Sequence, residues 1–398
     1  QLAQRNTHVL YYDCTNFFLE IEQEEGLRQY GISKEHRPNP IVQMGLFMDG
    51  DGIPLAFNIS PGNTNEQVTL TPLEERLLQD FKLSRLVVCT DAGLASAANR
   101  KFNDKKDRAF ITTQSIKKLK KSLQEWALDK TGWHIPGEKG AFDISKLDTD
   151  DAAAEAYKTT TFYKERWINE NGLEQRMVVT FSVKYRNYQR AVRQSQIDRA
   201  VNAVEKNPQK IGKTSQNDYK RFISKKSITP DGEIAKKNIY AIDAERIAKE
   251  ESFDGYYAIC TNLEDDAMQI IQLNHQRWEI EESFRIMKSE FRSRPVFLSR
   301  EDRIRAHFTT CFLALTLYRF LELKLDKAFS CHRILNGLRN MNFYKIRSEG
   351  YIPAYVFDDF METLHEKFPL KTNLQIIPNP EMKNIFRNSK NGKTLLQK

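Results

Sequence analysis

Short runs of apolar residues, several of them alternating with polar ones, predict β-strands in the first third of the chain. The expected strands are residues 9–22, 42–48, 54–60, 86–90 and 109–113. Asp49-Gly50-Asp51-Gly52, between the second and third strands, is typical of a tight hairpin. Leucines at helical spacing behind Asn65 predict a helix over 65–78, and an alanine-rich segment predicts another over 95–102. A meander of three strands, followed by strands alternating with helices, indicates a mixed α/β sheet flanked by helices.

The alternation of strands and helices is interrupted over residues 135–255. Residues 159–167 and 175–185 alternate like the two strands of a hairpin around Asn169-Glu170-Asn171-Gly172. A basic helix is expected over 188–206, followed by a polar, lysine-rich stretch to residue 237. We interpret this region as an inserted β-rich subdomain.

The α/β pattern resumes after residue 255. A strand is expected at 256–261, followed by long helices over 264–291 and 300–325, with Ser299 capping the second helix. Residues 331–398 predict one more helical stretch and a basic tail.

Three acidic residues far apart in the chain occupy positions that suit metal chemistry. Asp13 lies inside an apolar strand, and Asp91 ends another. A carboxylate is costly to bury unless it is paired or binds a cation, so two such acids on separate strands suggest a shared ligand. Taken singly, Asp13 could instead be a solvent-facing acid on an edge strand, and Asp91 could cap a turn or a helix.

Helical periodicity selects the third acid. Leu273, Ile280, Phe284 and Met287 fall on one stripe of the expected helix, which should face the core. The adjoining stripe holds Arg277, Glu281 and Lys288, whereas Glu279 and Glu282 point elsewhere. The simpler alternative is a solvated helix face on which Arg277 and Glu281 form an ordinary i, i+4 pair.

Charge, hydrophobicity and cysteine content indicate which partners and which cell compartment to expect. The formal net charge is +8, and basic residues concentrate at 101–121, 184–199, 206–237 and beyond 383, which favours a polyanionic partner. The longest apolar run, residues 307–318, is too short to span a bilayer, so no membrane association is expected. No signal peptide precedes residue 9, and the five unclustered cysteines suit reduced, packed thiols, so we expect a cytoplasmic protein.

These residues together resemble the DDE catalytic domain of bacterial insertion-sequence transposases, in the branch with the signature Y-x2-R-x3-E-x6-K. Arg277, Glu281 and Lys288 keep its spacing, and Asn274 stands where the signature has tyrosine. Two further segments are similar to the strands that carry the first and second acids of the family: Tyr11-Tyr12-Asp13-Cys14-Thr15 and Val88-Cys89-Thr90-Asp91-Ala92-Gly93. Pro61-Gly62-Asn63 and Arg303-Ile304-Arg305-Ala306-His307 also resemble recurring family segments, so the resemblance covers roughly residues 9–325.

The resemblance implies a ribonuclease H-like mixed sheet flanked by helices, with an inserted β-rich subdomain. Residues 1–134 and 256–330 would form the two parts of the catalytic domain, 135–255 the insertion, and 331–398 a C-terminal helical and basic region. The family usually also has an N-terminal helical domain that recognises DNA ends. This sequence starts without methionine shortly before the first strand, so we expect a fragment that lacks that domain.

The resemblance also implies the chemistry. Asp13, Asp91 and Glu281 would hold two Mg²⁺ ions, with Mn²⁺ able to substitute, for cleavage of transposon-end DNA and strand transfer into target DNA. Arg277, Lys288 and Asn274 would contact DNA, and a dimer on DNA in the bacterial cytoplasm, at the nucleoid, is expected. Three alternatives are a ribonuclease H-like nuclease, a domesticated DNA-binding protein without catalysis, and a structural protein with chance acids.

Overall fold

The structure is a computed structural model that describes residues 5–83, 86–206, 218–228, 234–368, 370 and 372–391. It divides into two compact units: Gln1–Ala109 with His275–Lys398, here called unit 1, and Phe110–Asn274, called unit 2. The domain boundaries expected from the sequence stay a proposal. Within the described residues, no helix is both long and apolar enough to cross a membrane.

Unit 1 contains the meander predicted from the sequence. Its strands are β1 (Val9–Phe18), β2 (Ile41–Asp49), β3 (Pro54–Pro61) and β4 (Leu86–Thr90), in the spatial order β3-β2-β1-β4. The first three strands pair antiparallel, whereas β4 runs parallel to β1. Strand β1 ends at Phe18, four residues before the expected end at 22. The mixed sheet flanked by helices confirms the expected α/β class, and the ribonuclease H-like topology stays what the resemblance implies.

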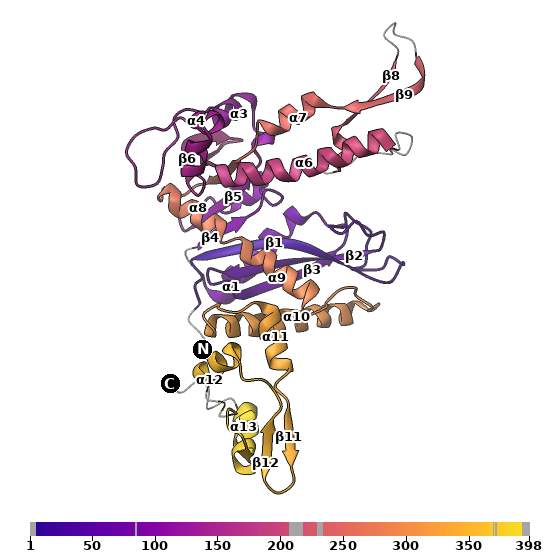
Figure 1. Ribbon diagram of the computed structural model, residues 1–398, viewed down its shortest axis with the longest axis vertical. Helices are drawn as coiled ribbons and strands as arrows, with labels where there is room; N and C mark the ends of the chain where they lie inside the picture. The colour runs from indigo at the N-terminus through magenta and orange to yellow at the C-terminus, as the bar shows by residue number, and fades with distance from the viewer. Residues whose placement is uncertain are drawn as a thin grey trace. The chain divides into compact units, whose positions relative to one another are not determined.

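Helices cover both faces of these strands (Figure 1). On one face, α1 (Leu70–Phe81) packs its leucines against alternate residues of β1 in one hydrophobic cluster. Helices α9 (Trp278–Ser289) and α10 (Glu301–Lys324) contact β1 and β3 through the other face. Helix α2 (Ala97–Phe102) follows β4.

Three helix predictions need correction. The helix expected over 65–78 is divided into a 3-10 turn, η1 (Glu66–Val68), which Asn65 caps, and α1. The helix expected over 264–291 is also divided, into α8 (Ala267–His275) and α9, because the chain turns at Gln276 and Arg277 with i to i+3 backbone bonds. Helix α10 begins at Glu301 after Arg300, so Ser299 is not its cap.

Unit 2 is built on antiparallel strands in the order β5 (Arg108–Gln114), β10 (Tyr256–Thr261), β7 (Leu173–Ser182) and β6 (Thr161–Glu170). The predicted hairpin is confirmed: β6 and β7 join through Asn171 and Gly172, both with positive φ, as a type I′ turn requires. Trp133, Phe162 and Phe181 fill the core behind these strands. Nearby helical elements are η2 (Ile116–Lys118), α3 (Lys121–Leu128), α4 (Lys146–Thr149) and α5 (Asp151–Ala156).

The basic helix of unit 2 is longer than expected. Helix α6 (Val183–Lys206) begins five residues before the expected start at 188. In the lysine-rich stretch, residues 207–217 and 229–233 lie outside the described residues. The remainder contains η4 (Tyr219–Phe222) and the paired strands β8 (Ile223–Ile228) and β9 (Ile234–Ile242), followed by α7 (Ala244–Glu251).

The end of the chain holds more structure than the one helical stretch expected. It contains α11 (Cys331–Arg339), α12 (Asp359–Lys367) and α13 (Asn379–Asn391). A small sheet joins β11 (Phe343–Ile346), β12 (Gly350–Pro353) and β13 (Ile377–Pro378). All five cysteines are free and buried, which confirms their expected role as packed thiols.

Candidate active site

Strand β1 divides its side chains between the core and the candidate site. Leu10, Tyr12 and Cys14 belong to the cluster that packs on α1. Successive side chains of a strand point to opposite faces, so Tyr11, Asp13 and Thr15 share the other face. On that face the Tyr11 hydroxyl donates to Gln276 Oε1 at 2.9 Å, and Thr15 Oγ1 accepts from Lys288 Nζ at 2.8 Å. Asp13 therefore lies between two contacts to the segment that carries Glu281.

The parallel pairing of β1 with β4 brings Asp91 beside Asp13. The register pairs Leu10 with Val88 and Tyr11 with Cys89. Two residues further along the same register, Asp13 falls opposite Asp91, and neighbouring strands lie about 4.8 Å apart. Asp91 is held in its turn by the Leu94 N–H, which donates to Asp91 Oδ1 at 3.0 Å. Two acids 78 positions apart in sequence thus meet on neighbouring strands in the interior of the sheet.

Gly93 leaves room for the Asp91 carboxylate. A Cβ at position 93 would lie 3.3 Å from both carboxylate oxygens. That distance is tighter than ordinary van der Waals contact, so a side chain here would press on the acid.

Burial and like charge together perturb Asp13. Desolvation is the largest cause that raises its pKa to about 7, and the neighbouring Asp91 carboxylate raises it further. Lys34, the Cys14 N–H and Arg277 act in the opposite direction. The Cys14 N–H donates to Asp13 Oδ1 at 2.7 Å, and Lys34 Nζ donates to the Cys14 carbonyl at 2.5 Å. The site therefore has a deficit of positive charge that a bound cation would offset.

Arg277 stands beside two of the three candidate acids. Its Nη1 lies 3.0 Å from Glu281 Oε1, and its charge also lowers the pKa of Asp13. The Arg277 side chain is only 16% exposed, whereas that of Glu281 is 57% exposed. The i, i+4 pair of the simpler alternative is thus present, and its arginine also acts on Asp13.

The other two glutamates of the segment have different partners. Glu279 pairs with Lys327 at 2.8 Å, and Glu282 pairs with Arg285 at 3.1 Å. Among these three glutamates, Glu281 is the one that Arg277 holds. The assignment of Glu281 as the third catalytic acid stays a prediction.

Lys288 is largely buried, whereas a lysine on a solvated helix face would be exposed. Its side chain is 12% exposed, lies over the Phe17 ring, and is 3.5 Å from Glu35 Oε1. Burial lowers its pKa, which the Glu35 carboxylate partly offsets. Asn274, at the tyrosine position of the signature, belongs to unit 2, where its Nδ2 donates to the Tyr257 hydroxyl at 3.2 Å.

Sequence reasoning did not select Lys34 or Glu35. Both lie in the loop between β1 and β2, which has no periodicity, and only the fold brings them to the site. A lysine beside an acid-bearing strand gives no signal in sequence, because its partner here is the Cys14 carbonyl, a main-chain group.

The donor chemistry of the site fits a divalent cation only in part. Carboxylate oxygens are the ligands that Mg²⁺ prefers, and Asp13 and Asp91 lie together. Across the described part of the chain, however, no three His, Cys, Asp or Glu side chains are grouped so that they could hold a metal ion. Glu281 is engaged by Arg277 instead. Metal binding by all three acids would therefore require Glu281 to exchange this partner.

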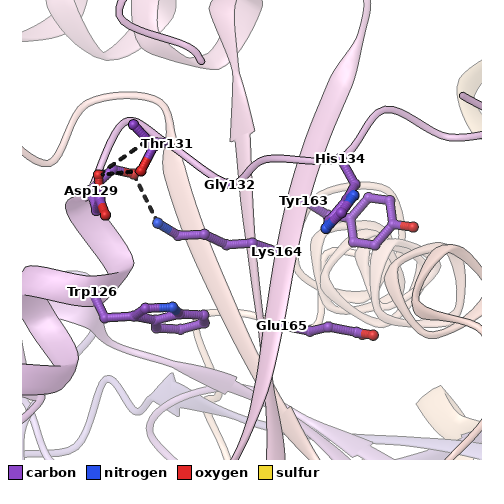
Figure 2. Close-up of a pocket in the computed structure, with 8 residues that line it drawn as sticks. All are labelled: Trp126, Asp129, Thr131, Gly132, His134, Tyr163, Lys164 and Glu165. Carbon is purple, nitrogen blue, oxygen red and sulfur yellow. Dashed lines mark hydrogen bonds between the residues drawn. The ribbon is translucent and has the colours of Figure 1, made fainter. Parts of the chain in front are cut away.

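Unit 2 has a pocket of about 480 Å³ beside β6, but its acids are already engaged. Figure 2 shows Asp129 bonded to Thr131 and Lys164 reaching towards Asp129 above the Trp126 ring. Lys164 Nζ donates to the Asp129 carbonyl at 2.8 Å, and burial lowers the pKa of its amine to about 8. Glu165 pairs with Arg176. This pocket therefore lacks the pair of neighbouring carboxylates found at Asp13 and Asp91.

Comparison with known proteins identifies a family. The family described as Transposase DDE domain matches residues 17–317, which include Asp91, Arg277, Glu281 and Lys288, while Asp13 lies four residues before the match. The comparison with curated proteins gave no match. Among solved structures, a chain of the piggyBac transposase synaptic complex with hairpin DNA is 7% identical, with a TM-score of 0.40 over 95% of this chain and 57% of that one. Because the family match covers more than half of its length, the chain belongs to the transposase DDE domain family.

Proposed function

We propose that this chain catalyses metal-dependent cleavage of transposon-end DNA and joins the freed end to target DNA. One observation carries the proposal. In a member of the transposase DDE domain family, Asp13 on β1 lies beside Asp91, which follows the parallel strand β4, and Arg277, paired with Glu281, acts electrostatically on Asp13.

Asp13, Asp91 and Glu281 would hold Mg²⁺, or Mn²⁺ in its place. Bound there, two divalent ions would activate the attacking hydroxyl and stabilise the leaving oxygen of the phosphodiester. In cleavage, the oxygen of a water molecule would form a bond to phosphorus as the P–O3′ bond breaks, and the leaving 3′-oxygen would take a proton, which gives a 3′-hydroxyl on the transposon end and a 5′-phosphate on the flanking strand. Strand transfer then forms a bond between that 3′-oxygen and a target phosphorus, as the target 3′-oxygen leaves with a proton.

The basic residues at the site would position the DNA. Arg277 would exchange Glu281 for a phosphate, and Lys288 and Lys34 would add positive charge close to the scissile bond. Such contacts fix the register of DNA without reading its sequence. Asn274 would contact the same DNA from unit 2, and two chains, one at each transposon end, would form the dimer expected for this family.

The Arg277–Glu281 ion pair favours one second candidate, a DNA-binding protein without catalysis. A pair that persisted on DNA would keep Glu281 from any metal. Products of cleavage and joining distinguish the two functions, because binding alone yields neither.

The test uses DNA from both flanks of the coding region, incubated with the protein and Mg²⁺. We expect nicked or cut ends and, with a plasmid target, joined products. Asp13→Asn, Asp91→Asn and Glu281→Gln should each abolish both reactions, because each removes a charge from the site. Glu282→Gln is the matched control, since Glu282 pairs with Arg285. Full activity of Asp91→Asn would contradict the proposed site, and absence of any product from the parent protein would contradict the proposed reaction.

A further inference from the structure

Three tyrosines of unit 2 form a cluster that the proposed chemistry does not use. Tyr256, Ala258 and Cys260 of β10 belong to the core, so Tyr257 points to the opposite face of its strand. Its hydroxyl lies 2.6 Å from Thr113 Oγ1 and accepts from Asn274 Nδ2. Because the amide donates, the phenolic proton is directed either to Thr113 or to an incoming acceptor.

The other two tyrosines lie on helix α6. Tyr185 and Tyr188 are three residues apart, so they share one side of the helix. Their side chains are 38% and 64% exposed. Helix α6 lies against the start of β10, because the Gly255 N–H donates to Gln189 Oε1 at 2.8 Å and Tyr257 pairs with Thr180, just before α6. Consistent with this, the pKa of Tyr185 is raised by burial and then by the nearness of Tyr257, Tyr188 and Asp254. We call Tyr185, Tyr188 and Tyr257 the tyrosine patch.

The charge around the patch is positive where it is accessible. Lys184, which directly precedes Tyr185 in the chain, is exposed. The half-exposed Arg190 makes a long ion pair, with 3.8 Å between its Nε and Asp254 Oδ2. Arg186 and Arg193 are buried and form ion pairs with Asp148 and Asp254, so they stabilise the fold and are not available to a ligand. Exposed aromatic rings beside the exposed Lys184 and the half-exposed Arg190 suit an anionic ligand with flat faces, which is the character of single-stranded nucleic acid.

We propose that the tyrosine patch binds unpaired nucleotides of DNA, with bases stacked on Tyr188 and Tyr185 and the Tyr257 hydroxyl donating to a sugar or phosphate oxygen. Asn274 is then a positioning residue, because its amide fixes the direction of that hydroxyl. The inference rests on DNA being the substrate under the proposed function. It adds a preference for strands that are not paired.

Binding to a fluorescein-labelled 20-nucleotide oligothymidylate, in buffer with EDTA, tests the patch. Loss of one stacked base weakens such binding by roughly tenfold. Tyr188→Leu should therefore lose about tenfold in affinity for this probe, whereas Tyr188→Phe, which keeps the ring, should not. A blunt 20-base-pair duplex should bind both variants like the parent. The matched control is Trp167→Leu, another exposed aromatic residue of unit 2, which should change neither affinity.

A second measurement finds the contact directly. An oligothymidylate with one 5-iododeoxyuridine should crosslink on irradiation to an aromatic ring stacked on that base, and peptide mapping should identify Tyr185 or Tyr188. Tyr257→Phe should retain the crosslink and bind more weakly, because only the hydroxyl is lost. Equal losses for duplex and single strand, or no loss in Tyr188→Leu, would overturn the proposal. Because no metal is present, these results stand apart from cleavage: a parent protein that cleaves DNA ends while its patch variants bind normally refutes the patch alone.

Discussion

Replacing Asp13 by asparagine should stabilise the folded protein in the absence of metal, even though it should abolish catalysis. The carboxyl of Asp13 is desolvated and faces Asp91, which is why its pKa is raised from an ordinary 3.8 to about 7. A carboxyl with a raised folded pKa favours the folded state while it is protonated. That advantage is complete below pH 3.8 and is lost as the pH rises through about 7.

The size of the expected stabilisation follows from the shift in the pKa of Asp13. Each pKa unit corresponds to about 1.4 kcal/mol, so ionised Asp13 costs the folded state about 4 kcal/mol above pH 7. At pH 5 Asp13 is ionised in the unfolded chain but still protonated in the folded chain. Taking up this proton on folding costs the folded state about 2 kcal/mol. Asparagine does not titrate, so Asp13→Asn should recover about 4 kcal/mol at pH 8 and about 2 kcal/mol at pH 5.

Urea denaturation of both proteins with EDTA at the two pH values measures this difference. Titrating groups that do not interact with Asp13 are common to the pair, so their contributions cancel. Asp80→Asn, at an exposed position of α1, is the control and should change stability by less than about 0.5 kcal/mol. A gain that is the same at pH 5 and pH 8, or a loss at pH 8, would refute the placement of a buried Asp13 next to Asp91.

Three further outcomes are expected. Millimolar Mg²⁺ should raise the melting temperature of the parent protein at pH 8 and leave that of Asp13→Asn unchanged, as read by differential scanning fluorimetry, because a ligand stabilises only a state that binds it. Lys288→Ala should lower the slope of log affinity for DNA against log salt by about one unit in a metal-free titration, and an unchanged slope would remove Lys288 from the DNA contacts. Arg193→Ala should cost about 3–5 kcal/mol in urea denaturation, because it leaves the buried Asp254 carboxylate without its main partner, whereas the exposed Arg199→Ala should cost little.

The strands of the sheet could be predicted because their apolar runs are local signals. Strands β4 and β10 match the expected residues at both ends, and β2 and β3 differ from them by no more than one residue at either end. The break between α8 and α9 could not be predicted, since Gln276 is held by Tyr11, a residue 265 positions away in sequence. The short strands at the end of the chain are likewise set by tertiary pairing, because β11 and β12 have four residues each.

The sequence could predict which residues form the candidate site, but it could not predict the contacts that they make. The sequence presents Asp13 inside one apolar run and Asp91 at the end of another, and the parallel register places them together. Periodicity favoured Glu281 over its neighbours and offered its pairing with Arg277 as an alternative, but it could not show that Arg277 is largely buried and acts on Asp13 as well. Lys34 illustrates the remaining limit, because its contact with the main chain of Cys14 depends on a loop path that no pattern encodes.

The alternation along β1 also separates two kinds of selection. Leu10, Tyr12 and Cys14 pack in the core and support folding, whereas Asp13, between them in sequence, opposes folding when ionised and, under the proposed function, is retained for catalysis. A saturation scan of residues 10–14, scored once for cellular abundance and once for mobility of the element, should show profiles that alternate with a period of two. Inactive descendants of the element should accordingly lose Asp13 early while they keep its even-numbered neighbours.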